Sequence, residues 1–231
     1  MRTLKTGGEM GKVLRRTKPL RPVGLYFALI ALGVVPCVPA CAADPDIPQH
    51  LTDLVVQALP MGRMADVEEA KDPAWPLKAK ASRVSREQLH CLREQLSSAG
   101  YRAQKLHDVE AYVLSHPADA EDDIKVLDNG AAFVANAFFM GSLKAKMKGT
   151  TPNRQEELKS VSARQMIAYT SYEYDPKYAA LRDLVGIGNV NDPTVAEDAR
   201  TQAIKVKMIT LNMDLMYRGM DACKIAPTVL L

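Results

Sequence analysis

Aromatic side chains are scarce in this chain of 231 residues: they make up 6% of it, and Trp occurs once. Surfaces that bind sugars or single-stranded nucleic acids by stacking need several such side chains, so we expect neither kind of site. The hydrolase motifs GxSxG and SxxK and the metal-binding motifs HExxH and CxxC are also missing. The composition, 47% hydrophobic and 25% charged, is typical of a folded globular protein.

Long hydrophobic runs are missing too, because the apolar run at residues 25–35 falls short of the roughly 20 residues of a membrane-spanning helix. Seven basic residues and one acidic residue precede this run, and the small residues Ala40 and Ala42 follow it. A basic segment, a short apolar segment and an A-x-A site are the three parts of a secretory signal peptide. We therefore predict that residues 1–43 are cleaved and that a periplasmic or secreted chain begins near Asp44.

Three other readings of this leader stay open. It could remain as a membrane anchor, although Pro36 and Pro39 interrupt it, or it could be a lipoprotein signal cleaved before Cys41. A cytoplasmic protein with a buried first helix is the third reading, and the basic flank argues against it. Translation could also begin at Met10 rather than Met1.

The charge of the mature chain excludes another class of function. The full chain has a net charge of +3, but residues 44–231 carry 23 basic and 26 acidic residues, a net charge of −3. Binding to nucleic acid requires a basic patch on the folded domain. The nearest candidate, Lys144, Lys146 and Lys148, is better explained by the favourable position of cations at a helix C-terminus. We expect no nucleic-acid partner.

Cysteines are few, and two of the four, Cys37 and Cys41, lie in the leader. In an oxidising compartment the remaining pair, Cys91 and Cys223, is expected to form a disulfide. Chain entropy would make such a bridge worth roughly 4–5 kcal/mol at most. The alternatives are two buried thiols, or a nucleophilic Cys91 beside His90.

Helical periodicity dominates the sequence after residue 46. Apolar residues recur at spacings of three and four, and helix starts are marked by Ser85 with Gln88, Asn153 with Glu156, Asp175-Pro176 and Asp192-Pro193. Residues 60–84 lack such a stripe and are interpreted as irregular. The sequence contains no alternation of apolar and polar residues bounded by hairpin turns, so we predict no strands.

The predicted fold is a single all-α domain of six to eight helices packed around two long buried helices. One of these covers residues 131–141, which are apolar nearly all round. The other is the last helix, with one apolar face at Ala199, Ala203, Val206, Met213, Tyr217 and Met220 and another at Ile204, Met208, Leu211 and Leu215. We divide the chain into the leader (1–43), a first helix with an irregular segment (44–84) and the helical domain (85–231).

No residue set predicts a cofactor. Met213, Met216 and Met220 share one helix face, and thioethers select Cu(I), so a copper-binding protein is one alternative; methionine as an ordinary core residue is the simpler explanation. A cell-envelope hydrolase with a Glu or His acid–base is a second alternative. His50, His90, His107 and His116 form no regular pairs, and the acids around Asp119 do not match a calcium loop.

These exclusions leave a binding or accessory protein as the first hypothesis, such as an inhibitor, immunity or assembly partner of another cell-envelope protein. Tyr and Trp are enriched where proteins meet. The candidate contact residues are therefore Trp75 and the tyrosines Tyr169, Tyr172, Tyr174 and Tyr178. The alternative for the tyrosines is that they close the rim of the core between two helices.

Overall fold

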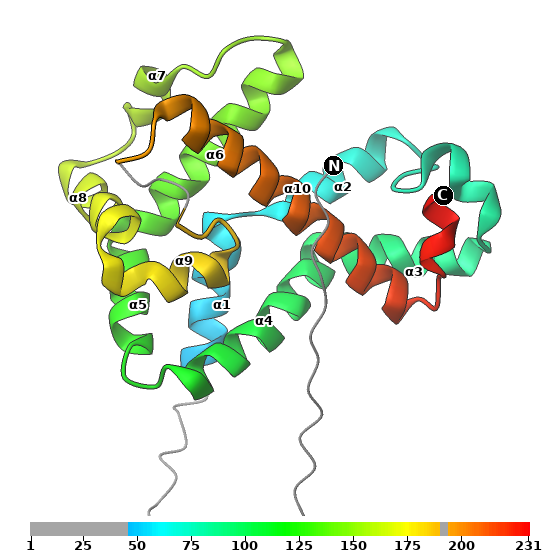
Figure 1. Cartoon of the computed structure of the whole chain (residues 1–231), viewed down its shortest axis with the longest axis horizontal. Helices are drawn as coiled ribbons and strands as arrows, with labels where there is room; N and C mark the ends of the chain where they lie inside the picture. Colours follow the sequence, from blue (N-terminus) through cyan, green and yellow to red (C-terminus); the bar gives the residue numbers. More distant parts are fainter. Residues whose placement is uncertain (1–45, 190–193) are drawn as a thin grey trace, which may run out of the picture. The chain divides into compact units, whose positions relative to one another are not determined.

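The domain is entirely helical in the residues that the computed structural model describes, 46–189 and 194–231, which contain no β-strand (Figure 1). The predicted leader, residues 1–43, lies outside this range. The described chain forms ten α-helices: α1 (Asp46–Ala58), α2 (Met61–Lys71), α3 (Arg86–Leu96), α4 (Ser98–Ser115), α5 (Ala120–Val126), α6 (Ala132–Lys148), α7 (Arg154–Leu158), α8 (Ala163–Tyr174), α9 (Ala179–Val185) and α10 (Glu197–Ala222).

Shorter helical turns connect these helices. A π-helical turn, η2 (Leu127–Ala131), joins α5 to α6, and three 3-10 turns are η1 (Lys78–Arg83), η3 (Pro176–Tyr178) and η4 (Pro227–Leu230). Gly130 in η2 has φ 119°, a conformation that glycine adopts readily. A side chain there would also collide with Gln165, so Gly130 allows α8 to pack directly on η2.

Local sequence signals explain several helix starts. Ser85 and Gln88 form the predicted capping box of α3, with each side chain bonded to the other's backbone N–H. Such a cap satisfies two of the amide donors that a helix leaves unpaired at its N-terminus. Asn153 caps α7 by accepting from the Glu156 amide, as its spacing predicts.

A large core forms around α1, which contacts α4, α5, α6 and α9. The predicted stripe on α1 faces inward, and Leu51, Val55, Ala58 and the following Leu59 are completely buried. Buried side chains from α2, α4, α5, η2, α6, α8, η3, α9 and α10 also belong to this large core. It therefore collects segments from most of the described sequence.

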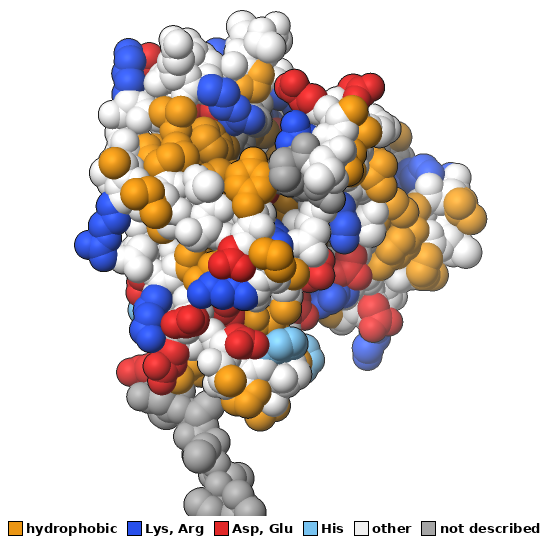
Figure 2. All heavy atoms as spheres, turned by 60° about the vertical axis from the view of Figure 1, so that its left-hand side comes forward, with side chains coloured by type: hydrophobic (Ala, Val, Ile, Leu, Met, Phe, Trp, Pro, Cys, Tyr) orange, Lys and Arg blue, Asp and Glu red, His pale blue; other side chains and the backbone are white. Residues whose placement is uncertain are grey.

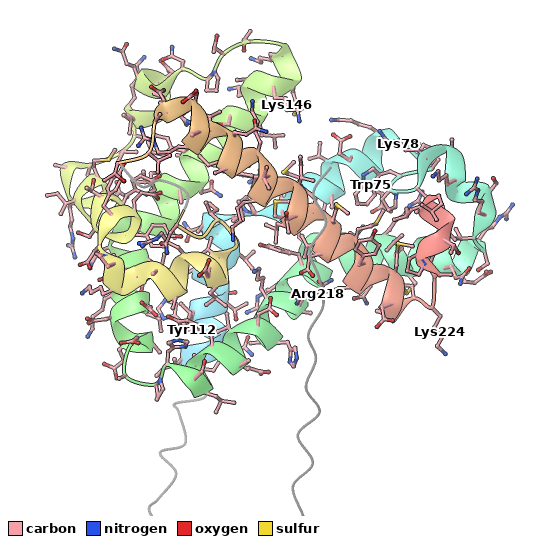
Figure 3. All side chains as sticks on the ribbon, viewed as in Figure 1. Trp75, Lys78, Tyr112, Lys146, Arg218 and Lys224 are labelled. Atoms are coloured by element: carbon pink, nitrogen blue, oxygen red, sulfur yellow. A yellow bond between two sulfur atoms is a disulfide. The ribbon has the colours of Figure 1, made fainter. Side chains whose placement is uncertain are left out.

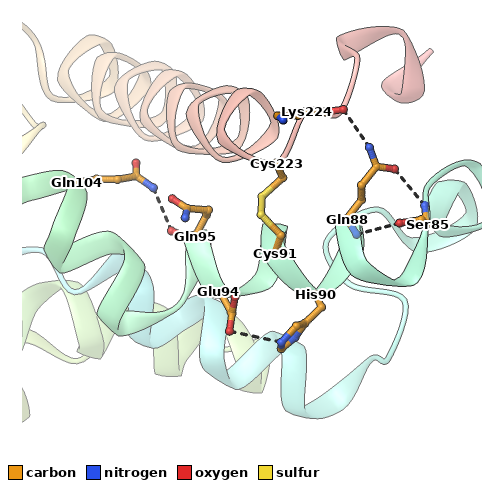
Figure 4. The surroundings of a disulfide bond; sticks show 9 residues. All are labelled: Ser85, Gln88, His90, Cys91, Glu94, Gln95, Gln104, Cys223 and Lys224. Atoms are coloured by element: carbon orange, nitrogen blue, oxygen red, sulfur yellow. Dashed lines mark hydrogen bonds and ion pairs between the residues drawn. A yellow bond between two sulfur atoms is a disulfide. The ribbon is translucent and has the colours of Figure 1, made fainter.

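A separate small core joins η1, α3 and the C-terminal part of the chain. It is built on Leu77, Leu92, Met220, Cys223 and Ile225. The predicted Cys91–Cys223 disulfide is present and closes a separation of 132 residues (Figure 4). The Gln88 side chain donates to the Lys224 carbonyl oxygen, and Lys80 and Arg83 donate to the carbonyl oxygens of Leu230 and Val229.

The predicted all-α domain is confirmed, with ten helices where six to eight were expected, and two features of the chain explain the difference. Residues 60–84 are not all irregular: α2 occupies 61–71, where Ala, Met, Glu and Lys favour a helix. Only Met61 and Gly62 of α2 are buried, so the helix carries almost no apolar stripe by which to recognise it. The helix predicted to run from Asn153 to Tyr174 is broken at 159–162 and restarts at a second capping box, Ser162 with Gln165.

Burial of the two long helices also differs from the prediction. At the end of η2 and the start of α6, Ala131, Ala132, Val134 and Ala135 are buried, but Phe133 is 37% exposed and residues 136–143 are only half-buried. In α10 only Leu215, Gly219 and Met220 are buried. Up to Leu215 the helix packs through the second predicted face, at Ile204, Met208, Leu211 and Leu215. Beyond it, Met220 of the first predicted face is completely buried in the small core. The predicted start signal Asp192-Pro193 lies outside the described residues.

None of the helices in the described ranges combines the length and hydropathy needed to cross a membrane.

Candidate functional site

An apolar cavity of about 250 Å³ lies where α2, α3, α4 and α10 meet, and we call it the Trp75 cavity. Three of its residues are methionines: Met61 and Met64 from α2, and Met216 from α10. Figure 3 shows Trp75 in the segment that follows α2. The remaining lining residues are Ala65, Glu68, Pro76, Gln95, Leu96, Tyr101, Asn212 and Leu215. The lining is thus mainly hydrophobic with a few polar groups, as is usual for ligand pockets.

The first wall of the cavity is set by the close approach of α2 to α4. Gly62 leaves room for the backbone of Ser98, because a Cβ at position 62 would lie within 3 Å of the Ser98 backbone atoms. Asp66 accepts hydrogen bonds from the Ser98 amide, at 3.1 Å, and from its hydroxyl. A carboxylate at the start of α4 is also favoured by the helix dipole.

The Trp75 segment is held by Arg93 of α3. Its guanidinium donates to the carbonyl oxygen of Trp75 at 2.9 Å and to that of Pro73. The same guanidinium lies 3.8 Å from the carboxylate of Glu69 on α2. One side chain therefore joins α2, α3 and the loop that carries Trp75, which keeps the indole at the edge of the cavity.

The wall formed by α10 is fixed at its C-terminal half. Gly219 brings α10 close to α3, because a Cβ there would lie 3.0 Å from the Leu92 side chain. Arg218 bridges Asp108 of α4, at 2.9 Å, and Asp214 of its own helix, at 2.8 Å. The cavity wall at Asn212, Leu215 and Met216 is therefore held to both α3 and α4.

Charges beneath the cavity belong to this support. The ammonium of Lys105 is buried, donates to the Leu184 carbonyl oxygen at 2.8 Å and lies 3.7 Å from Asp108. Burial lowers the pKa of Lys105, and the nearby Asp108 carboxylate opposes that shift. Burial and the Asp108 charge raise the pKa of Tyr101, so its hydroxyl stays neutral.

An exposed apolar line runs along α10 beside the cavity. Val206, Ile209, Met213 and Tyr217, which we call the α10 stripe, are between 42% and 61% exposed. Their spacings of three, four and four residues place them on one side of the helix. Met213 and Met216 are three residues apart and therefore neighbours on the helix surface. The stripe therefore borders the wall of the Trp75 cavity at Met216.

The four tyrosines predicted as partner contacts do not form one exposed group. Tyr172 and Tyr178 are 2% and 7% exposed and belong to the large core, and the half-buried Tyr169 packs edge-on against Phe138 at 5.3 Å. This placement favours the alternative that they close the core. Tyr174 alone is well exposed, at 49%.

The three methionines considered for Cu(I) do not meet. Met213 lies on the exposed stripe, Met216 lines the cavity and Met220 is completely buried in the small core. The structure instead brings Met216 together with Met61 and Met64. No cluster of three His, Cys, Asp or Glu residues suited to a metal occurs in the described part of the chain.

A second, more polar hollow lies between α5 and α8. Lys125 and Lys177 share the carboxylate of Asp122 at 3.6 Å each, and the Arg164 guanidinium is held by the Asn129 side chain. Figure 2, which faces the α8 side, shows acidic and basic side chains interspersed in its lower part, whereas hydrophobic ones gather above. Opposite charges that neutralise one another in this way are typical of a solvated surface.

Sequence reasoning identified Trp75 but missed Met61, Met64 and the role of the α10 stripe. The methionine pair has no partner nearby in the sequence, and Met216 follows Met61 by 155 residues. A comparison with protein-family models, with curated proteins and with solved structures found no match. The geometry of the site is therefore the basis for a functional proposal.

Proposed function

We propose that this chain is an exported protein-binding module, an accessory partner of another cell-envelope protein, and that it docks through the Trp75 cavity and the α10 stripe. One observation carries the proposal: an apolar side of α10 stays exposed directly beside an apolar cavity. Continuous exposed apolar surface is costly in a soluble monomer and is characteristic of interaction sites.

The lining of the cavity supports this use. Methionine side chains are flexible and polarisable, which suits surfaces that adapt to an apolar group from a partner. Trp75 adds a large, stiff contact area of the kind that dominates the energy of protein interfaces. The disulfide and the basic–apolar–small pattern of residues 1–43 support export.

A hydrolase receives less support from the same site. The only carboxylate that lines the Trp75 cavity is Glu68, and the Lys71 ammonium lies 2.9 Å from it. General acid–base catalysis needs a second group within reach of the first. The lining residues include no His and no second acid.

A second candidate function is Cu(I) binding, because three thioether side chains line one cavity. Titration of the oxygen-free, disulfide-bonded protein with Cu(I) should then quench Trp75 emission. Met64→Leu should weaken binding, and Met208→Leu, which changes a methionine outside the cavity, should not. Equal binding by both variants would rule out this site.

The docking function is tested in cells with a photo-crosslinking amino acid at position 209 of the full chain. A cell-envelope protein should be joined in stoichiometric yield from position 209. Position 114 on α4 is the matched control, since Leu114 is 82% exposed but lies on another helix. The mass of the recovered chain should also match that of a protein that begins near Asp44. Equal crosslinking from both positions, or none from 209, would contradict the proposal.

A further inference from the structure

We infer that the occupant of this surface is an amphipathic α-helix of the partner, with acidic residues along the edges of its apolar stripe. This inference rests on the proposed function and adds the chemistry of the partner. It is carried by the spacing of the α10 stripe, by the charge of the surrounding helix surface and by the position of the cavity.

The spacing of the α10 stripe favours a helix over an extended peptide. Val206, Ile209, Met213 and Tyr217 form a ridge of the kind that packs into the grooves of another helix. An extended peptide is normally bound by adding a strand to an open sheet edge. The described residues contain no sheet and so offer no such edge.

The charge around the stripe favours acidic residues. Residues 199–218, which include the stripe, contain four basic residues, Arg200, Lys205, Lys207 and Arg218, and one acidic residue, Asp214, which is paired with Arg218 at 2.8 Å. Lys205 and Lys207 are exposed and lie on either side of Val206 in the helix. Lys207 extends toward Gly188. Its Nζ would lie 3.2 Å from a Cβ added at that glycine. Lys205 is therefore the cation best placed to meet a carboxylate of the partner.

The cavity gives the partner helix a defined position. On α10 it is lined by Asn212, Leu215 and Met216, which lie alongside Met213 and Tyr217 of the stripe, so a helix lying along the stripe would pass beside its opening. A large apolar side chain that entered the cavity there would be enclosed by Met61, Met64 and Trp75. Interfaces commonly concentrate their energy in one such enclosed side chain.

The test uses a designed helical peptide of about 18 residues, a length of about 27 Å. It carries Leu at spacings of three and four, Glu on both flanks and neither Trp nor Tyr. The comparison peptide has Lys in place of every Glu. Because the chain contains a single Trp, the emission of Trp75 reports directly on the cavity of the intact, disulfide-bonded protein.

We expect the acidic peptide to shift Trp75 emission and to bind at least about tenfold more tightly than the basic one at low salt. Lys205→Glu should reduce or reverse that preference. Ala65→Phe, which fills the cavity, and Met213→Asp, which places a charge on the stripe, should each weaken binding by about tenfold or more. Leu114→Asp should leave it unchanged.

Equal binding of the two peptides would overturn the charge argument, and binding unaffected by both Ala65→Phe and Met213→Asp would overturn the site. If neither peptide binds while position 209 still crosslinks to a cell-envelope protein, the helical occupant is wrong and the docking function stands. If no protein crosslinks either, the docking function falls as well.

Discussion

The large core and the small core hold their helices together by different means. The large core buries side chains from α1, α4, α5, α8 and α9 around the completely buried Leu51 and Val55. The small core has only five buried residues, and it adds the Cys91–Cys223 disulfide and hydrogen bonds to the C-terminal turn. Covalent linkage therefore compensates for a core too small to be stable through burial alone.

The Trp75 cavity lies at the junction of these two cores. Met61, Tyr101 and Leu215 of its lining belong to the large core, whereas Met216 packs against the small one. Because α10 contributes Leu215 to one core and Met220 to the other, its position determines the shape of the cavity. Substitutions that move α10 should therefore change the shape of the cavity.

Leu51→Ala should have the largest effect on stability, since it leaves a cavity at the centre of the large core. We expect a loss of about 2–5 kcal/mol in the free energy of unfolding, measured by urea denaturation. Leu92→Ala removes an equally buried leucine from the small core. It should cost less, because the disulfide still holds α3 to the end of α10. Equal losses would mean that the two cores unfold as one unit.

Replacing both Cys91 and Cys223 by Ala should cost about 2–4 kcal/mol. Hydrogen exchange should then become faster in α3 and in residues 220–230, while α1 keeps its protection. Reduction of the unmodified protein provides an independent control and should give the same pattern. Faster exchange spread evenly over both cores would show that the bridge stabilises the whole domain instead.

The two capping boxes form a matched pair, one in each region. Ser85→Ala and Ser162→Ala each remove a side-chain acceptor from a helix start and should cost about 1 kcal/mol. Hydrogen exchange should place the Ser85→Ala effect in α3 and the Ser162→Ala effect in α8. Exposed serines without a cap, such as Ser171, should tolerate the same change.

Asp123 should make the stability of the large core depend on pH. Its carboxylate is buried and accepts a hydrogen bond from Tyr112 at 2.6 Å. Burial raises the pKa of Asp123, an effect that the Tyr112 hydroxyl opposes. The protonated carboxyl is therefore favoured by folding, and this stabilisation is lost as pH rises through the raised pKa.

Asp123→Asn should consequently gain stability relative to the unmodified protein between acidic and neutral pH, by less than ~1 kcal/mol. Urea denaturation from pH 3 to 7 measures the difference. Tyr112→Phe removes the opposing hydrogen bond and should make the pH dependence steeper. A difference that shrinks toward neutral pH would show that the ionised form is the favoured one.

Much of the helical fold follows from local signals, as the capping box at Ser85 and the inward stripe of α1 illustrate. The disulfide was also predictable, since the predicted leader, if cleaved on export, leaves two cysteines. Helix α2 was not predicted from the sequence because only its first residues, Met61 and Gly62, are buried. Its helical structure depends on residue propensity, which is a weak signal compared with an apolar stripe.

The candidate site was harder to predict than the fold. Both apolar faces of α10 are visible in the sequence, but periodicity does not show which face meets the domain. Tertiary packing chose the face with Leu211 and Leu215, and so left Val206 and Ile209 exposed. The Trp75 cavity depends on contacts between segments more than 100 residues apart, which local patterns do not encode.

The smallest effect on stability is expected where the effect on function should be large. Ile209 is 61% exposed, so Ile209→Ser removes little buried surface and should change the free energy of unfolding by less than ~0.5 kcal/mol. The same substitution interrupts the α10 stripe at its centre and should weaken binding of the proposed cell-envelope partner. Val55→Ala offers the reverse control, because Val55 is completely buried in the large core and does not reach the surface. It should lower stability and leave binding by the folded protein intact. Loss of stability in Ile209→Ser would mean that the exposed stripe supports the fold, and an apolar surface that the fold requires would no longer imply a partner.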